Sequence, residues 1–293
     1  MRALTYHGSN DDGRGDFRVE DVPDPSVGPG MVRLDVEWCG ICGSDLHEFE
    51  AHTVSGYAPP IIIGHEFAGT VAEVGEGVEA VSVGDRVAVE PFLRCNACEA
   101  CLADQYHLCP SLTVVGAQAT DGGFAQRAIV PAYAVHVLPA SVPTDVGALV
   151  EPLAVGWHAL RKGHFSAGQS VLVIGAGPIG LTSLLCAQAM EASLVAVSVR
   201  RAGARAEAAS DLGADAVLDS SADDVAARIM ELTDGRGVDV VIETSGAPEA
   251  MTTAIGAVRA GGTIVSVAVW LAPAPCDYMQ LLLKEITIVG SKG

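Results

Sequence analysis

One stretch of this 293-residue sequence, residues 171–180, constrains the fold more than any other. Residues 171–174 (Val-Leu-Val-Ile) are apolar and mostly β-branched, which is typical of a strand buried in a parallel sheet. They lead directly into Gly-Ala-Gly-Pro-Ile-Gly, the G-x-G-x-x-G pattern, and a helical stretch, residues 179–192, follows. The pattern is common by chance, but this strand–turn–helix order favours a dinucleotide-binding loop over a glycine-rich turn without a ligand.

The three glycines of this pattern have different predicted roles. Gly175 permits the tight turn, Gly177 lets the backbone approach the pyrophosphate, and Gly180 allows the helix to pack closely on the strand. Pro178 and Ile179 open the helix, whose first N–H groups and positive dipole end attract phosphate. We therefore predict that a nicotinamide dinucleotide binds at this turn.

Strand-like and helical stretches alternate along the chain after about residue 143. Such alternation is typical of a doubly wound parallel sheet with helices on both faces. The predicted strands are residues 170–174, 194–199, 216–218, 239–243, 263–268 and 287–290, and the predicted helices are residues 145–163, 179–192, 205–212, 223–233, 248–258 and 276–283.

The end of the second of these strands is basic where an acid often stands. An Asp or Glu about twenty residues after the glycine loop binds the adenosine ribose of NAD, whereas arginine favours the 2′-phosphate of NADP. Here Arg200 and Arg201 follow the strand, and Arg205 lies on the next helix. No acid appears before Glu207, and guanidinium groups pair with phosphate in a forked geometry. The sequence thus favours NADP over NAD, the alternative being that these arginines are solvated charges at a helix start.

The first half of the chain is rich in short strand-like runs separated by glycine, proline and aspartate turn signals. No stretch here has sustained helical periodicity. The pattern divides the chain into a strand-rich domain, residues 1–148, and a nucleotide-binding domain, residues 149–293. The clearest runs of the first domain are residues 32–36, 69–74, 86–89 and 128–130.

The acidic composition excludes one class of partner. A formal net charge of −19 argues against nucleic acid, because basic surfaces bind phosphate backbones. The longest apolar runs, such as residues 171–174 and 281–283, are far too short to span a bilayer, and the first seven residues contain no apolar signal core. We therefore expect a cytoplasmic protein with neither a nucleic-acid nor a membrane partner.

Four of the eight cysteines, Cys95, Cys98, Cys101 and Cys109, form the pattern C-x2-C-x2-C-x7-C. Clustered cysteines in a cytosolic chain more often bind metal than form disulfides. Four thiolates match the closed tetrahedral site of a structural zinc, and an iron–sulfur cluster takes the same ligands. The spacing predicts a metal without naming it, and four thiolates leave no open position for catalysis.

A second set of candidate ligands is dispersed along the chain: Cys39, His65, Glu66 and Glu151. Each alone has a plain structural interpretation, as a small buried side chain, a packed histidine or an acid at a helix start. Together they supply the mixed sulfur, nitrogen and oxygen ligands of a catalytic zinc that keeps one position open.

At this point the whole chain resembles the zinc-containing medium-chain dehydrogenase/reductase family. The motifs that carry the resemblance stand in the family's order, and three stretches look most like the butanediol, sorbitol and threonine dehydrogenase branch. The family motifs are Gly64-His65-Glu66, Gly84-Asp85-Arg86-Val87, the four-cysteine segment and the glycine loop, and the branch stretches are residues 39–48, 122–125 and 149–155.

The resemblance implies an α/β fold, with a GroES-like β-barrel catalytic domain, a doubly wound Rossmann domain and an active site in the cleft between them. It also implies a homodimer or homotetramer, because the family pairs Rossmann domains edge to edge, with residues 265–269 and 285–289 as candidate interface strands. Family members continue with further helices and strands after the last strand predicted here. We expect this C-terminal segment of the family to be absent from the given sequence.

The resemblance also assigns the ligands. It implies that the four-cysteine segment binds zinc, and that Cys39 and His65 ligate the catalytic zinc with Glu66 as the third protein ligand. Glu151 would bind the metal directly or hold its water. Ser44 and His47 stand where the family places its proton relay.

The implied activity is hydride transfer between a secondary alcohol, a vicinal diol or polyol such as 2,3-butanediol, and NAD(P). A carboxylate in place of a thiolate makes zinc a harder Lewis acid, which suits oxygen-rich substrates. The alternatives are a threonine-type amino-alcohol dehydrogenase and a non-catalytic NADP-binding or redox-sensing relative.

Overall fold

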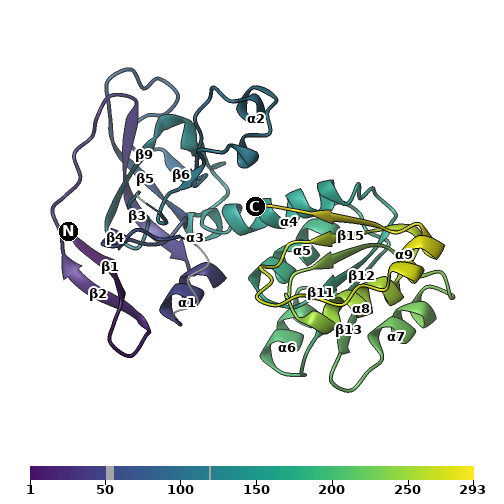
Figure 1. Cartoon of the computed structure of the whole chain (residues 1–293). Helices are drawn as coiled ribbons and strands as arrows, with labels where there is room; N and C mark the ends of the chain where they lie inside the picture. The colour runs from purple at the N-terminus through teal and green to yellow at the C-terminus, as the bar shows by residue number, and fades with distance from the viewer. Residues whose placement is uncertain (51–55, 119) are drawn as a thin grey trace. The chain divides into compact units, whose positions relative to one another are not determined.

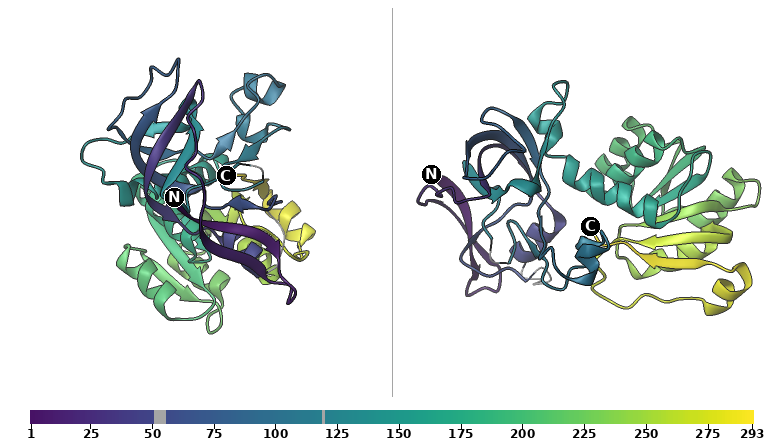
Figure 2. Two further views of the ribbon diagram at one scale, coloured as in Figure 1. Left: turned by 90° about the vertical axis from the view of Figure 1, so that its left-hand side faces the viewer. Right: turned by 90° about the horizontal axis from the view of Figure 1, so that it is seen from above.

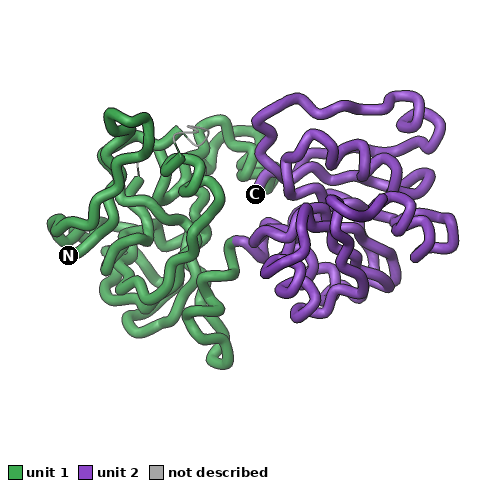
Figure 3. The backbone as a smooth tube through the Cα atoms, turned by 90° about the horizontal axis from the view of Figure 1, so that it is seen from below, with its two compact units in different colours: residues 1–151 green, residues 152–293 purple. Residues whose placement is uncertain are grey.

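The structure, a computed structural model, describes residues 1–50, 56–118 and 120–293. The chain divides into two compact units, residues 1–151 and 152–293 (Figure 3). Strands dominate the first unit, drawn in purple to teal in Figure 2, whereas helices and strands alternate in the second. Within the described part of the chain, no helix has both the length and the apolar character needed to cross a membrane.

Antiparallel strands form the framework of the first unit (Figure 1). They are β1 (Arg2–Ser9), β2 (Gly15–Asp21), β3 (Met31–Gly40), β4 (Ile61–Ile62), β5 (Glu66–Val74), β6 (Arg86–Val89), β7 (Phe92–Leu93), β8 (Thr113–Val114), β9 (Arg127–Pro131) and β10 (Val135–Val137). One sheet has the order β10-β6-β5-β3-β9, a second has the order β2-β1-β4, and β7 pairs with β8. The predicted strand runs all lie in the first of these sheets.

The core of the first unit lies under the larger sheet. Along β3, Val32 and Leu34 are fully buried while Asp35 is exposed, the alternation expected of a half-buried strand. Phe67 and Val71 of β5 pack in the same cluster. This shared core holds β3 beside β5. The candidate metal ligands lie just after the end of β3 and at the start of β5.

Most of the short helices in the first unit were not predicted from the sequence. These are α1 (Gly43–Phe49), α2 (Glu99–Leu102) and two 3₁₀ turns, Tyr106–Leu108 and Ala132–Ala134; a further short helix, α3 (Thr144–Gly147), coincides with the start of the predicted helix 145–163. Four to seven residues carry at most two turns of apolar repeat, so periodicity does not reveal such helices.

The predicted helix 145–163 is two helices in the structure, α3 and α4 (Val150–Lys162). Pro152 accounts for the new start, since proline is accepted in the first turn of a helix but not in its interior. The boundary between the two compact units falls inside α4, after Glu151.

A six-stranded parallel sheet forms the centre of the second unit (Figure 1). Its strands are β11 (Ser170–Ile174), β12 (Leu194–Val199), β13 (Ala216–Asp219), β14 (Val238–Glu243), β15 (Val258–Ser266) and β16 (Thr287–Gly290). Their order, β13-β12-β11-β14-β15-β16, is the 3-2-1-4-5-6 order of a dinucleotide-binding sheet. Strand β15 begins at Val258, earlier than the predicted residue 263, and it lies inside the sheet, so only β16 of the two candidate interface strands is at an edge.

Helices cover both faces of this sheet. Besides α4, they are α5 (Pro178–Ala189), α6 (Ala204–Asp211), α7 (Val225–Leu232), α8 (Pro248–Ala257) and α9 (Tyr278–Lys284). Leu160 of α4 and Leu184 of α5 pack on one face, and Ile229 of α7 and Ala254 of α8 pack on the other. This arrangement confirms the predicted doubly wound fold.

Candidate functional site

A group of three potential metal ligands lies in the first unit, where β3 ends and β5 begins. Cys42 is the N-cap residue of α1, His65 directly precedes β5, and Glu66 is the first residue of β5. One ligand atom from each lies within 4.8 Å of the other two. We refer to Cys42, His65 and Glu66 as the mixed-ligand group.

Two glycines leave the space that this group occupies. Gly40 pairs directly with Glu66 across the two strands, and a side chain at Gly40 would collide with the Glu66 carboxylate. Gly64 adopts a φ of +97°, which favours glycine, and a Cβ there would lie 2.9 Å from Sγ of Cys39 and from the Phe124 ring. The backbone therefore turns His65 and Glu66 inward at a place where no larger residue fits.

The buried carboxylate of Asp45 supports the mixed-ligand group from behind. Its Oδ2 accepts the backbone N–H of Cys42 at 3.0 Å, which caps α1, and its Oδ1 accepts the Tyr57 hydroxyl at 2.8 Å. The same Oδ1 lies 4.0 Å from Nδ1 of His65. A carboxylate behind a ligating histidine orients the ring and raises its basicity.

Burial dominates the electrostatics of the group. Desolvation raises the pKa of Cys42 to about 12, although the hydroxyl and backbone N–H of Ser44 act in the opposite direction. Desolvation also raises the pKa of Glu66, although the charge of the neighbouring His65 acts to lower it. Glu151 lies within electrostatic reach of both His65 and Glu66, and desolvation raises its pKa to about 7. Buried acids and a buried thiol favour their neutral forms unless a cation is present.

The chemistry of the group fits zinc. It offers one sulfur, one nitrogen and one oxygen, the set found in catalytic zinc sites that keep a position open. Nδ1 of the buried His65 makes no hydrogen bond within the described residues and lies 4.0 Å from the Asp45 carboxylate, so the histidine would present its other ring nitrogen to an ion.

The group includes Cys42, which was not predicted as a ligand, and does not include the predicted Cys39, although the Cys39 thiol lies close to residue 64. Cys39 lies on β3 opposite Phe67, and its thiol points to the carbonyl of Gly40 at 3.6 Å. Cys39 is still part of β3, which ends at Gly40, and it packs against the edge of the core under the larger sheet. Ser44 and His47 are both half-buried on α1.

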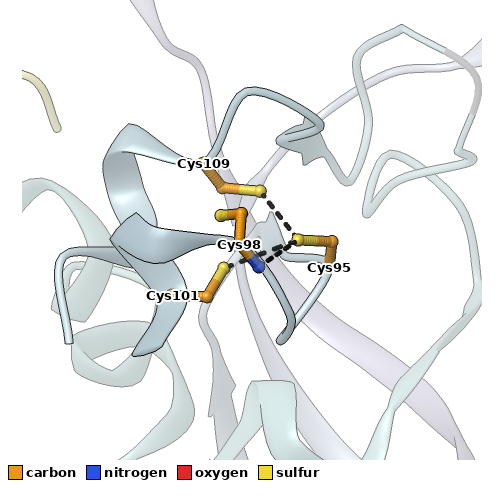
Figure 4. A group of neighbouring side chains, drawn as sticks. All are labelled: Cys95, Cys98, Cys101 and Cys109. Atoms are coloured by element: carbon orange, nitrogen blue, oxygen red, sulfur yellow. Dashed lines mark hydrogen bonds between the residues drawn. The ribbon is translucent and has the colours of Figure 1, made fainter. Parts of the chain in front are cut away.

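The four cysteines of the predicted structural site gather in one loop (Figure 4). Their sulfurs point toward one another, with Sγ of Cys95 3.5 Å from that of Cys109 and 3.8 Å from that of Cys101. The N–H groups of Ala97 and Cys98 stabilise the Cys95 thiolate and lower its pKa to about 6. All four sulfur atoms lie within 4.8 Å of one another, which suits a single tetrahedral ion.

The glycine-rich turn joins β11 to α5 in the second unit. Gly175 has a φ of +101°, and Gly177 is the N-cap residue of α5, with Pro178 in the first turn. A Cβ at Gly180 would collide with the carbonyl of Gly175, whereas a Cβ at Gly177 would meet no atom within 4 Å. The three glycines thus have the different surroundings that the dinucleotide pattern requires: a tight turn, an open approach and a close packing.

The three arginines that follow β12 are exposed. Arg200 and Arg201 lie in the bend after the strand, and Arg205 lies in the first turn of α6. Asp219, at the end of β13, holds this bend by accepting the backbone N–H of Ala202 at 2.8 Å. The three arginines are thus exposed just beyond β12, the strand that pairs with β11, and the charge of Arg201 acts on Asp219.

Comparison with known proteins identifies the family. The model of the alcohol dehydrogenase GroES-like domain matches residues 28–140, and that of the zinc-binding dehydrogenase domain matches residues 178–293. An (R,R)-butanediol dehydrogenase of Neisseria gonorrhoeae is 37% identical over 290 residues, which cover 95% of this chain and 81% of that protein. The chain belongs to the zinc-containing medium-chain dehydrogenase family.

Two further proteins show how closely other members of the family match. An L-threonine 3-dehydrogenase of Pyrococcus abyssi is 41% identical over 276 residues, or 93% of this chain and 78% of the relative. The X-ray structure of the 2R,3R-butanediol dehydrogenase of Bacillus subtilis superposes with a TM-score of 0.89 at 35% identity, over 99% of this chain and 83% of that one. The family and the two-part GroES-like and Rossmann fold predicted from the sequence are both confirmed.

Several residues around the sites of this medium-chain dehydrogenase were missed from the sequence. The spacing of Cys42 and Asp45, N-cap and N3 of a helix, is the capping-box spacing and could have placed both at the start of α1. Tyr57 is remote from Asp45 in sequence and gave no signal. Glu151 was predicted as a ligand, and it lies outside the group of residues whose ligand atoms are all within 4.8 Å of one another.

Proposed function

We propose that this dehydrogenase transfers hydride between a secondary alcohol and NAD(P) at a zinc held by Cys42, His65 and Glu66. The observation that carries the proposal is the close approach of these three different ligand atoms. Cys95, Cys98, Cys101 and Cys109 would hold a second, structural zinc. Residues 1–148 would form the catalytic domain and residues 149–293 the cofactor domain.

Each polar residue near the mixed-ligand group has a proposed task. Asp45 orients His65, and Glu151 supplies a fourth candidate ligand, a carboxylate outside the group that would bind the ion or hold its water. Bound zinc would act as a Lewis acid on a substrate hydroxyl, and the nicotinamide would carry the hydride. The substrate hydroxyl proton would pass to the Ser44 oxygen as Ser44 gives its own proton to His47, which would release it toward solvent, as a positioned acid–base relay does.

The substrate we propose is a vicinal diol or a polyol. The oxygen ligand of Glu66, with Glu151 nearby, makes the ion harder than a second thiolate would, and hard ions suit substrates that offer more than one oxygen. The likeness to butanediol dehydrogenases supports this choice. Threonine, an amino alcohol, is the second candidate, because a threonine dehydrogenase is 41% identical.

The cofactor we propose is NADP in preference to NAD. Arg200, Arg201 and Arg205 are all exposed at the end of β12 and the start of α6, where a 2′-phosphate would lie. Within the described residues, the end of β12 presents no carboxylate of its own to a ribose diol; Asp219, from β13, is occupied by the N–H groups of Ala202 and Ser221.

We also propose a cytoplasmic homo-oligomer. The clustered thiols of the four-cysteine segment favour a reducing compartment, and all eight cysteines are free thiols. The outer edge of β16 is the edge at which two such sheets could pair, and Ile288 on it is 39% exposed. Sedimentation analysis would measure the number of chains, and a monomer at micromolar concentration would contradict the paired arrangement.

A substrate panel combined with metal analysis tests the proposed function. The purified protein is assayed with 2,3-butanediol stereoisomers, sorbitol, xylitol and L-threonine, each with NAD⁺ and NADP⁺, and its zinc and iron are counted. We expect two zinc ions per chain and turnover of a diol or polyol. Preference for threonine selects the second candidate, cofactor binding without turnover of any substrate indicates a non-catalytic relative, and iron rejects the assignment of the four-cysteine lobe.

A further inference from the structure

The turn after β14, residues 243–246, lies directly beside the glycine-rich loop. Ile174 and Glu243 are paired residues at the ends of the parallel strands β11 and β14, so the chain segments that follow them meet at the same edge of the sheet. The backbone N–H of Thr244 donates to the carbonyl of Ile174 at 2.9 Å. The two turns are therefore one connected structure, although they are remote in sequence.

The Thr244 hydroxyl fastens the two turns together. Its oxygen lies 2.9 Å from the carbonyl oxygen of Ile174 and 3.2 Å from that of Gly175, and its single proton can serve either. A Cβ at Gly175 would lie 2.8 Å from this hydroxyl oxygen, and a Cβ at Gly180 would lie 3.1 Å from it. The hydroxyl thus occupies the inner side of the cofactor loop and holds the two peptide planes with which the loop begins.

The buried carboxylate of Glu243 holds the turn that carries Thr244. Its Oε1 accepts the backbone N–H and the hydroxyl of Ser245, at 2.8 and 2.6 Å, and the N–H of Gly246 at 3.1 Å. Its Oε2 is buried and has no hydrogen-bond partner in the described part of the chain, and the side chain is 0% exposed. Burying a half-satisfied carboxylate costs free energy, which is expected where the geometry serves a function.

The loop therefore has one supported side and one open side. Gly175 and Gly180 face the Thr244 hydroxyl, while a Cβ at Gly177 would meet no atom within 4 Å. A pyrophosphate approaches from the open side, where the N-terminus of α5 begins. Preorganising the supported side reduces the ordering cost of binding on the open side.

We propose that Thr244 and Glu243 are positioning residues for the dinucleotide. Thr244 fixes the peptide planes of Ile174 and Gly175, and Glu243 fixes the turn from which Thr244 reaches them. Neither residue needs to touch the cofactor, because both act through the shape of the loop. The proposal rests on the cofactor binding proposed above and holds for NAD and NADP alike.

Cofactor affinity of a Thr244→Val variant tests the proposal. Valine keeps the shape of the side chain and removes the hydroxyl. We expect the Kd for NADPH and for NADH, measured by nicotinamide fluorescence, to rise by roughly tenfold, or about 1.4 kcal/mol. Thr244→Ser, which keeps the hydroxyl, should bind both cofactors nearly as the wild type does. Thr253→Val is the matched control, because its hydroxyl bonds Glu249 within α8, away from the loop.

The outcomes separate this proposal from the proposed function. A wild-type protein that binds neither cofactor overturns both. If the wild type binds a cofactor and Thr244→Val binds it with the same Kd, only the positioning role is overturned. The same holds if the ligand-free variant has a lower Tm but an unchanged Kd. If Thr244→Val does not fold, Glu243→Met carries the test, since methionine keeps the length of the side chain and removes the oxygen that accepts the three hydrogen bonds of the turn; we expect weaker binding of both cofactors, and unchanged binding overturns the proposal.

Discussion

The Tyr57 hydroxyl donates a 2.8 Å hydrogen bond to Oδ1 of Asp45. The same carboxylate oxygen lies 4.0 Å from Nδ1 of the buried His65. A carboxylate and then a tyrosine thus lie behind His65 of the mixed-ligand group. If these two side chains stabilise the orientation of His65, replacing either of them should weaken metal retention, which can be measured without an activity assay.

Asp45→Asn should weaken zinc binding at the mixed-ligand group by about 10- to 100-fold, because the ring of His65 loses its anionic partner. Tyr57→Phe should have a smaller effect in the same direction. The measurement is zinc retained during titration with a chelator. Asp35→Asn, at an exposed position of β3, is the control. Wild-type retention by Asp45→Asn would show that Asp45 serves only as the helix cap.

Two cysteine variants separate the ligand from its neighbour. Cys42→Ser should lower the zinc content from two ions per chain to one, while Cys39→Ser should keep both, because only Cys42 lies in the mixed-ligand group. Replacement of the zinc by cobalt gives a second readout, a sulfur-to-cobalt absorption band from this site that only Cys42→Ser should lose. Loss of one ion in Cys39→Ser, with Cys42→Ser unaffected, would restore the ligand predicted from the sequence.

Arg200→Asp should reverse or abolish the preference for NADP. Removing a guanidinium that pairs with phosphate costs about 1.5–3 kcal/mol, so the Kd ratio of the two cofactors should shift at least tenfold toward NAD. Arg228→Asp, which changes the same charge on the exposed side of α7, should leave the ratio unchanged. An unaltered ratio in Arg200→Asp would mean that the arginines after β12 are only solvated charges.

Asp239 gives the second unit an acid-sensitive stability. Desolvation raises the pKa of Asp239, but hydrogen bonds from the Ser170 N–H, from Arg259 and from the Ser170 hydroxyl outweigh it and hold the pKa at about 2. A folded-state pKa below the unfolded value of about 3.9 stabilises the fold above that pH, and the contribution is lost as the pH falls through 4 toward 2. It amounts to about 2 kcal/mol at neutral pH.

The measurement is the free energy of unfolding of wild type and Asp239→Asn between pH 7 and pH 3. The asparagine variant should be less stable at pH 7, and its deficit should narrow as the wild-type carboxyl becomes protonated. Asp211→Asn, at an exposed position of α6, should show no such convergence. A deficit that stays constant with pH would assign the loss to packing alone.

The sequence predicted the second unit far better than the first, for a physical reason. The strand β11, the glycine turn and the helix α5 are adjacent in the chain, so a local pattern reports their contact, and all six predicted strands of the sheet exist. The mixed-ligand group depends on the pairing of β3 with β5, which no local pattern contains. The resemblance pointed to Cys39, and the sequence alone did not show that β3 ends at Gly40 and that Cys42 lies beside His65 and Glu66.

The same distinction explains what was missed around the cofactor loop. Thr244 reaches Ile174 through the register of two parallel strands, and such a contact between distant segments leaves no trace in composition or spacing. Likewise, β15 was predicted as a candidate interface strand, but its place inside the sheet follows from strand order, which one sequence does not reveal.

The contact between Gly40 and Glu66 makes the residue at one position depend on the residue at the other. The Glu66 carboxylate fills the space that a side chain at residue 40 would need, so an alanine there would force this carboxylate to shift. We therefore expect Gly40→Ala to change how Glu66 meets an ion although no proposed ligand residue is altered. The absence of a side chain on one strand thus leaves room for the carboxylate of the neighbouring strand.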